Sequence, residues 1–110
     1  MECIANIQEG IESQFILLSN EEKLSVISHG AAVRLSDFNK RLFLAQSKIR
    51  FFEEKYRKQL SELEESGLPD DADYEMHEDY IMWHHWTKEA AKSQKQIDSL
   101  QAIVVYGVYR

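Results

Sequence analysis

The chain has 110 residues and 12.9 kDa, which fits one domain spanning 1–110 and leaves no room for a large catalytic scaffold with a separate cofactor domain. With 44 % hydrophobic and 29 % charged residues, the chain can form a packed core, which excludes a disordered protein. Four Gly and one Pro are too few for the turns of an all-β sandwich or barrel, so we expect an all-α fold.

The net charge of −6 is unevenly distributed along the chain. Residues 34–58 carry eight bases and three acids, whereas residues 59–87 carry nine acids and neither Lys nor Arg. A basic block beside an acidic block indicates that the two meet each other or a partner, and it disfavours general nucleic-acid binding. In a helix that contains residues 34–58, the basic residues flank a seam of apolar side chains. Bases in such positions more often guide helix pairing than contact phosphates.

Cysteine usage and the N-terminal sequence bear on the cellular compartment. Cys3 is the only cysteine, so it has no partner for an internal disulfide or a paired metal site. The first residues lack the basic start and apolar run of a secretory signal, and no apolar stretch approaches the roughly 18 residues that span a bilayer. We therefore expect a soluble, cytoplasmic protein with no membrane partner.

The first predicted element is a helix over about residues 3–18. Its apolar residues recur at steps of three and four, which places them on one helical face: Ile4, Ile7, Ile11, Phe15 and Leu18. Residues 19–22 then have the spacing of a capping box, so a new helix is predicted to start near Asn20.

The strongest pattern in the sequence is an apolar seam that alternates steps of four and three. Its members are Ala31, Leu35, Phe38, Leu42, Ala45, Ile49, Phe52 and Tyr56. Leu60 and Leu63 extend it after a step of four where three is due. Such a seam favours packing against another helix at about 20°. The second helix is predicted over 20–66, because Gly67 and Pro69 then end it.

The length of that helix poses two alternatives. An unbroken helix over 20–66 runs roughly 70 Å, whereas a compact chain of this size is only about 35 Å across. Either the helix breaks near 30–36, at Gly30 or Ser36, to give a compact four-helix arrangement, or the molecule is elongated and buries its seam against a second copy. We favour the homodimer, and the sequence does not fix whether its chains run parallel or antiparallel.

A third long helix is predicted over 71–100, after acidic residues that the helix dipole favours at an N-terminus. Its apolar stripe comprises Met76, Tyr80, Trp83, Thr87, Ala90, Gln94 and Ile97, broadened by Trp86 and Leu100. Pairing with the preceding helix forms an antiparallel hairpin, which brings the acidic start beside Lys55, Arg57 and Lys58. The β-branched and aromatic tail at 101–110 is predicted to be a strand or a docked segment.

One cluster has the composition of a metal or acid-base site: Asp73, Glu75, His77, Glu78, Asp79, His84 and His85. His77 and His84 share a helical face, so a metal-binding bundle with hydrolase or oxidase activity is the enzymatic alternative. However, no Glu-x-x-His ligand motif occurs in the chain. We therefore predict a solvated acidic face and no catalytic residue, cofactor or metal ligand.

The favoured function is non-enzymatic protein binding by an acidic, Trp-rich helix. Trp and Tyr dominate interface hot spots, and two Trp three residues apart are not expected to point together into a thin two-helix hairpin. The predicted partner-binding residues are Asp73, Glu75, Glu78, Asp79, Tyr80, Trp83 and Trp86. A structural coiled coil or nucleic-acid adaptor that uses the basic block is the third reading.

Three segments between about residues 45 and 86 resemble a known group of proteins. They are Phe52-Glu53-Glu54-Lys55-Tyr56, Gly67-Leu68-Pro69-Asp70-Asp71 and Glu75-Met76-His77-Glu78-Asp79-Tyr80-Ile81-Met82-Trp83. This arrangement resembles small helical bacterial and archaeal proteins that act as antitoxin components of toxin-antitoxin modules. The resemblance implies binding and neutralisation of a basic partner protein without catalysis. The chain departs from the group in its N-terminal extension, 1–36, and in its apolar tail after Leu100.

Overall fold

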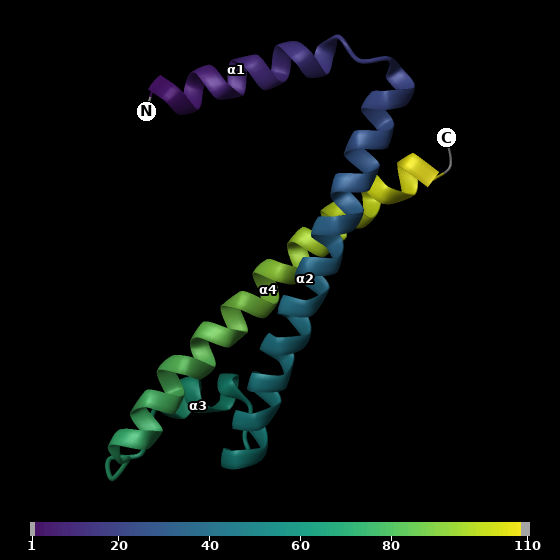
Figure 1. Cartoon of the computed structure of the whole chain (residues 1–110). Helices are drawn as coiled ribbons and strands as arrows, with labels where there is room; N and C mark the ends of the chain where they lie inside the picture. The colour runs from purple at the N-terminus through teal and green to yellow at the C-terminus, as the bar shows by residue number, and fades with distance from the viewer. Residues whose placement is uncertain (1, 109–110) are drawn as a thin grey trace.

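The protein is an all-α helical hairpin with an additional N-terminal helix. The computed structural model describes the backbone of residues 2–108 and the side chains of residues 8–105. Within this range the chain forms α1 (Glu2–Ile16), α2 (Asn20–Tyr56), α3 (Leu60–Ser66) and α4 (Tyr74–Val108), and no strand. The long helices α2 and α4 pack lengthwise, α3 lies near the closed end of the hairpin, and α1 turns away at the open end (Figure 1). The predicted all-α hairpin is confirmed.

The second helix begins where the sequence predicts. Ser19 lies just before it in an extended conformation, and its hydroxyl accepts a hydrogen bond of 3.1 Å from the backbone N–H of Glu22. The helix then runs without interruption through Gly30 and Ser36, so the predicted alternative of a break at 30–36 is wrong. The molecule is elongated as a result, with extents of 64 × 38 × 19 Å.

The break in this region of the chain comes later, at residues 57–59. Arg57 adopts a left-handed conformation, with φ 54° and ψ 38°, so α2 ends at Tyr56 rather than at residue 66. The short helix α3 follows, and its residues Leu60 and Leu63 are buried against the hairpin. A continuous helix would have carried these two leucines towards the end of the hairpin, where α4 has only begun. Turning the chain instead buries them on Trp83.

Two contacts near the closed end fix the register of the hairpin. Phe52 stacks on Trp83, and the Tyr56 hydroxyl hydrogen-bonds Asp79. Carried along both helices, this register pairs α2 and α4 as follows: Ile49 with Trp86, Ala45 with Ala90, Leu42 with Ser93, Phe38 with Ile97, Leu35 with Leu100, and Ala31 with Val104. All of these residues are buried or half-buried, so the stripe on α2 forms the interface with α4.

The stripe on α4 differs from the predicted one at two positions. Thr87 and Gln94 are exposed, and Trp86 and Ser93 lie in the interface in their place. Ser93 is only 2 % exposed. The pattern of apolar residues does not include Ser93, because its side chain is polar. However, a small side chain opposite Leu42 allows the two helices to approach closely.

The last helix begins and ends later than expected. It starts at Tyr74, where the Asp73 carboxylate accepts a hydrogen bond of 2.8 Å from the backbone N–H of Met76. The tail predicted as a strand or a docked segment is helical up to Val108, while residues 109 and 110 lie outside the described part. Val104, on this continuation of the helix, is half-buried. None of the described helices has the length and hydropathy needed to cross a membrane.

The main core lies where α2, α3 and α4 meet at the closed end. Phe52, Leu60, Leu63 and Trp83 form its buried cluster. Trp83 is 0 % exposed, with ring centroids 5.8 Å from Phe52 and 6.0 Å from Tyr56. The structure therefore buries Trp83, which the sequence predicts as a partner-binding residue, because α3 covers the side of the hairpin that the sequence pattern leaves open.

Replacing Gly30 tests the continuity of α2. A Cβ at this position would meet no atom within 4 Å, and the interior of a helix favours Ala over Gly. Gly30→Ala is expected to raise the free energy of unfolding by about 1 kcal/mol in urea denaturation. Gly67→Ala is the control of opposite sign, because Gly67 has φ 75° and a side chain there is strained. A loss of stability in Gly30→Ala would contradict the unbroken helix.

Replacing Trp83 tests the core at the closed end. Trp83→Ala is expected to lower the free energy of unfolding by about 3–5 kcal/mol, because it leaves a large cavity. Ile81→Ala, on the same helix but 60 % exposed, is expected to change it by less than about 0.5 kcal/mol. Chemical denaturation followed by circular dichroism measures both. Equal effects of the two substitutions would place Trp83 on the surface.

Candidate functional site

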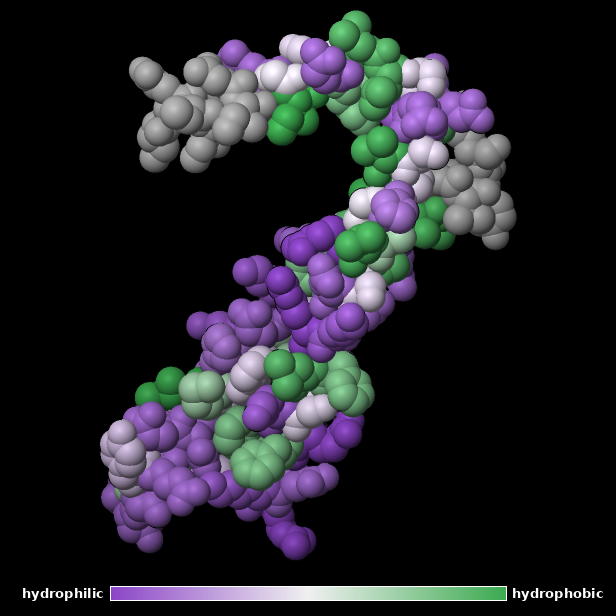
Figure 2. Space-filling view, viewed as in Figure 1, coloured by the Kyte–Doolittle hydropathy of each residue, from purple (hydrophilic) through white to green (hydrophobic). Residues whose placement is uncertain are grey.

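The closed end of the hairpin carries a dense set of exposed carboxylates, which we call the acidic end. They come from α3, from the linker 67–73 and from the first turns of α4. Its members are Glu62, Glu64, Glu65, Asp70, Asp71, Asp73, Glu75 and Glu78, and all of them are exposed. Figure 2 shows this end as a largely hydrophilic surface, in contrast to the apolar patches nearer the open end.

Lys55 connects α2 to the start of α4. Its Nζ atom lies 2.5 Å from Oε1 of Glu75 and 2.6 Å from Oδ2 of Asp79. The neighbouring Tyr56 hydroxyl donates a hydrogen bond of 2.6 Å to the same Asp79 oxygen. Asp79 is the more enclosed of the two carboxylates, because 18 % of its side chain is exposed against 69 % for Glu75. The arrangement fixes the direction in which α4 leaves the closed end.

These contacts shift the proton affinities of the three groups that meet at Asp79. Burial of the phenol, followed by its hydrogen bond to Asp79, raises the pKa of Tyr56 to about 12. The hydrogen bond to Asp79, and then the one to Glu75, raise the pKa of Lys55. Burial alone would raise the pKa of Asp79, but the hydrogen bonds from Lys55 and Tyr56 outweigh it and hold this pKa below its ordinary value. Asp79 is therefore a carboxylate at neutral pH.

A second contact ties α3 to α4. Nε2 of His84 lies 3.0 Å from Oε1 of Glu64, and the ring of Tyr80 packs edge-on against His84 at 4.7 Å between centroids. Glu64 itself remains exposed. The histidine thus steadies the acidic α3 against the hairpin.

An open hollow lies between the linker and α4. It is lined by Lys55, Tyr56, Pro69, Asp71, Ala72, Asp73, Glu75 and Met76. Pro69, Ala72 and Met76 give it apolar surface, and three carboxylates surround them. Lys55 also lines the hollow and pairs with Glu75, and the Asp73 carboxylate caps α4, so Asp71 is the lining carboxylate for which the described structure gives no such contact.

The structure separates the predicted partner-binding residues into three groups. Three of them make contacts within the chain: Asp73 caps α4, and Glu75 and Asp79 form ion pairs with Lys55. Asp73 and Glu75 nevertheless remain exposed. Trp83 is buried, and Tyr80 and Trp86 are half-buried against the core.

The third group is Glu78, whose side chain is exposed. The predicted set therefore combines surface carboxylates with the residues that hold them in place.

The histidines do not assemble a metal site within the described residues. No group of three or more His, Cys, Asp or Glu side chains is close enough there to hold an ion. Although His77 and His84 share a face of α4, His77 is exposed and His84 turns towards Glu64. The described geometry therefore does not bring His77 and His84 to a common site.

The basic block is used only partly at the closed end. Lys55 pairs with acids as predicted, whereas the described structure gives no ion pair to Arg57 or Lys58. Further along α2, the guanidinium groups of Arg34 and Arg41 lie 5.0 and 4.9 Å from the ring centroid of Phe38. These two arginines flank the seam and cover its aromatic ring, which supports the pairing role over phosphate contact.

Sequence reasoning overlooked two parts of this site. The hydrogen bond from Tyr56 to Asp79 does not follow from residue spacing, which places Tyr56 only in the apolar seam. The role of α3 as a cover on Trp83 was also not expected. The irregular step between Tyr56 and Leu60 was the signal that the helix ends there.

Comparisons with known proteins returned no relative. No family model, no curated protein and no solved structure matches the chain.

Removing the Tyr56 hydroxyl tests the Asp79 contact. Tyr56→Phe is expected to lower the free energy of unfolding by about 0.5–1.5 kcal/mol at neutral pH, because Asp79 loses one hydrogen bond. Tyr74→Phe is the control, because Tyr74 is 79 % exposed and donates no hydrogen bond within the described residues. Urea denaturation of both variants measures the difference.

The loss of stability in Tyr56→Phe is expected to depend on pH. The folded-state pKa of Asp79 lies below the ordinary value of an aspartate, so its carboxylate stabilises the fold above about pH 4, and this contribution is lost as the pH falls through the lowered pKa. The difference between wild type and Tyr56→Phe should therefore shrink in acid. A difference that grows below pH 4 would contradict the carboxylate assignment.

Proposed function

We propose that the protein is a non-enzymatic protein-protein interaction module whose acidic end binds a basic partner protein. The observation that carries the proposal is the set of exposed carboxylates at the closed end, within a stretch, 59–87, that contains no Lys or Arg. Antitoxin-like neutralisation of a basic toxin is its most specific form. The partner would be a cytoplasmic protein.

The rigidity of the acidic end supports this function. The carboxylates stand on the best-packed part of the molecule, above the cluster of Phe52, Leu60, Leu63 and Trp83. Lys55 and His84 hold α4 and α3 in place from the sides. A charged surface that is already ordered loses less conformational freedom on binding, and its field attracts a basic protein at a distance.

We propose the following contact residues from their exposure. Trp83 acts from inside by positioning α4, and the direct contacts come from exposed acids such as Glu64, Asp71 and Glu78. Tyr74, which is 79 % exposed between them, is the aromatic side chain best placed to insert into a partner.

We further propose that the acting unit is a homodimer. The chain exposes 8631 Å², whereas a compact monomer of 12.9 kDa is expected to expose about 6,300 Å². The surplus of about 2,300 Å² exceeds the roughly 800 Å² that each partner buries in a standard interface. A second copy can therefore bury an ordinary dimer interface and still leave the acidic end free.

Neutralising the acidic end tests the main proposal. The probe is the protein encoded by the adjacent reading frame, titrated against the wild type and against a Glu64→Gln, Asp71→Asn, Glu78→Gln variant. The variant is expected to raise Kd at least about tenfold at low salt, and added salt should weaken wild-type binding as screening predicts.

A charge-matched variant provides the control for this titration. Glu21→Gln, Glu22→Gln and Asp98→Asn remove the same charge at exposed positions away from the closed end. This variant should bind within about threefold of wild type, because exposed charges beyond a Debye length contribute little. Equal losses in the two variants, or a basic neighbouring protein that binds neither of them nor the wild type, would contradict the acidic end as the binding surface.

A further inference from the structure

Helix α1 presents an apolar face that the rest of the chain leaves uncovered. Ile11 is 64 % exposed, and Ile16 and Leu17 are exposed at its end. The extensive contact between helices in the described structure is that of α2 with α4, and α1 points away from both (Figure 1). An isolated helix of 15 residues is only marginally stable in water. The amphipathic pattern of α1 therefore calls for a surface against which it can pack.

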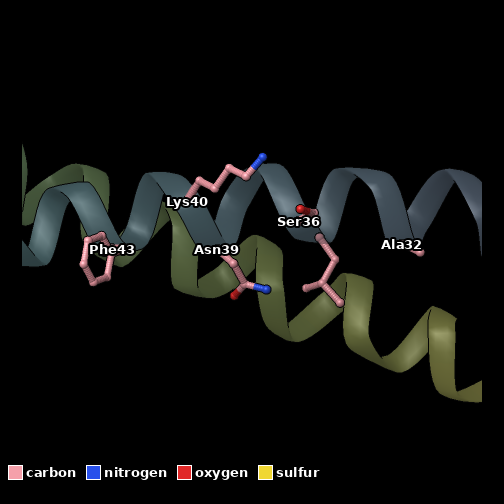
Figure 3. Close-up of a pocket in the computed structure, with 6 residues that line it drawn as sticks. Ala32, Ser36, Asn39, Lys40 and Phe43 are labelled. Atoms are coloured by element: carbon pink, nitrogen blue, oxygen red, sulfur yellow. The ribbon is translucent and has the colours of Figure 1, made fainter.

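A second apolar hollow lies on the flank of α2, which we call the α2 hollow. It is open to solvent and lined by Ala32, Leu35, Ser36, Asn39, Lys40 and Phe43 (Figure 3). Phe43 is 72 % exposed at one end of it. The hollow lies beside the seam with α4, so a helix placed in it would continue an interface that already exists.

Charge favours α1 as the helix that fills the α2 hollow. Residues 1–22 contain five acids and no Lys or Arg, and Glu9 and Glu12 are exposed on α1. Between residues 34 and 50 lie five bases and one acid, Asp37, which already pairs with Arg34. Two copies of α1 would repel each other, and an acidic helix is poorly suited to an anionic membrane surface, whereas α1 and the middle of α2 attract.

The α1 helix of the same chain cannot reach the far end of the hollow. At 1.5 Å per residue its 15 residues measure about 22 Å. Phe43 lies about 35 Å along α2 from Asn20, where the chain enters that helix. If α1 folded back on its own α2, it would end before the exposed ring of Phe43. A second copy has no such restriction.

We propose that α1 of one copy docks in the α2 hollow of a second copy, and that the exchange is reciprocal. Ile11 and Phe15 then pack against Leu35 and Phe43 of the other chain, while Glu12 lies within reach of Lys40. A twofold axis relates the two contacts, so both apolar faces are covered in one closed dimer. This inference rests on the proposed homodimer and specifies its interface, and it does not depend on the acidic end.

The oligomeric state of surface variants tests the interface. Sedimentation velocity over a dilution series should show a dimer for the wild-type chain. Ile11→Asp should raise the dimer Kd at least about tenfold, because it places a charge in an apolar contact. Ile81→Asp is the matched control, because Ile81 is 60 % exposed on α4 at the other end of the hairpin and should leave Kd unchanged. A monomeric wild type would overturn both the homodimer and this interface, whereas a dimer that tolerates Ile11→Asp would overturn the interface alone.

Charge exchange separates a direct contact from a loss of folding. Glu12→Lys and Lys40→Glu are each expected to weaken the dimer several-fold, and the double variant should recover most of the loss. Circular dichroism should show unchanged helicity in all three chains. Additive losses in the double variant would contradict the proximity of Glu12 to Lys40.

A cross-link between different chains tests the exchange directly. In a Cys3→Ser background, Gln14→Cys and Ser36→Cys chains are mixed and treated with a short bismaleimide. Each chain has one thiol, so a product that contains both chains reports an intermolecular contact. The Gln14→Cys chain mixed with a Ser61→Cys chain is the control and should give little product. Equal yields in the two mixtures would overturn the proposed docking.

Discussion

The structure depends on the enclosure of one indole ring. Trp83 lies between Phe52 and Tyr56 of α2, and α3 closes over the same junction with two leucines. A hairpin of two helices is thin and cannot by itself remove so large a ring from water. Folding α3 back supplies the missing third side, and it requires the left-handed turn at Arg57. The end of α2 at Tyr56 and the short helix α3 therefore follow from one packing requirement.

Away from this junction the hairpin is held by a narrow seam. Its register continues from Trp83 to Val104 on α4 and from Phe52 to Ala31 on α2. Small side chains lie in the middle of the seam, where Ala45 and Ser93 are almost completely buried. Such a seam buries little area per turn, which explains why so many apolar side chains remain exposed on the outer faces.

Much of this arrangement could be read from residue spacing alone. The stripe on α2 is apolar at every position, so its helix, its buried face and its pairing with α4 were all predictable, as was the meeting of Lys55 with the acidic segment. The α4 stripe was only partly predictable, because one of its buried positions is a serine. The end of α2 is marked only by the irregular step from Tyr56 to Leu60, and this signal is weak because Leu60 and Leu63 still extend the stripe. The position of Trp83 could not follow from its own helix, since the residues that cover it come from elsewhere in the chain.

The two tryptophans of the chain occupy different surroundings, and this gives the protein an internal optical reporter. The indole of Trp83 is fully shielded and lies against two aromatic rings, whereas that of Trp86 is only half-buried. Shielded indoles fluoresce at shorter wavelengths than hydrated ones. Any event that loosens the closed end admits water to Trp83 and shifts the emission to the red, while events at the open end leave it unchanged. The spectrum of the unlabelled chain thus distinguishes changes at its two ends.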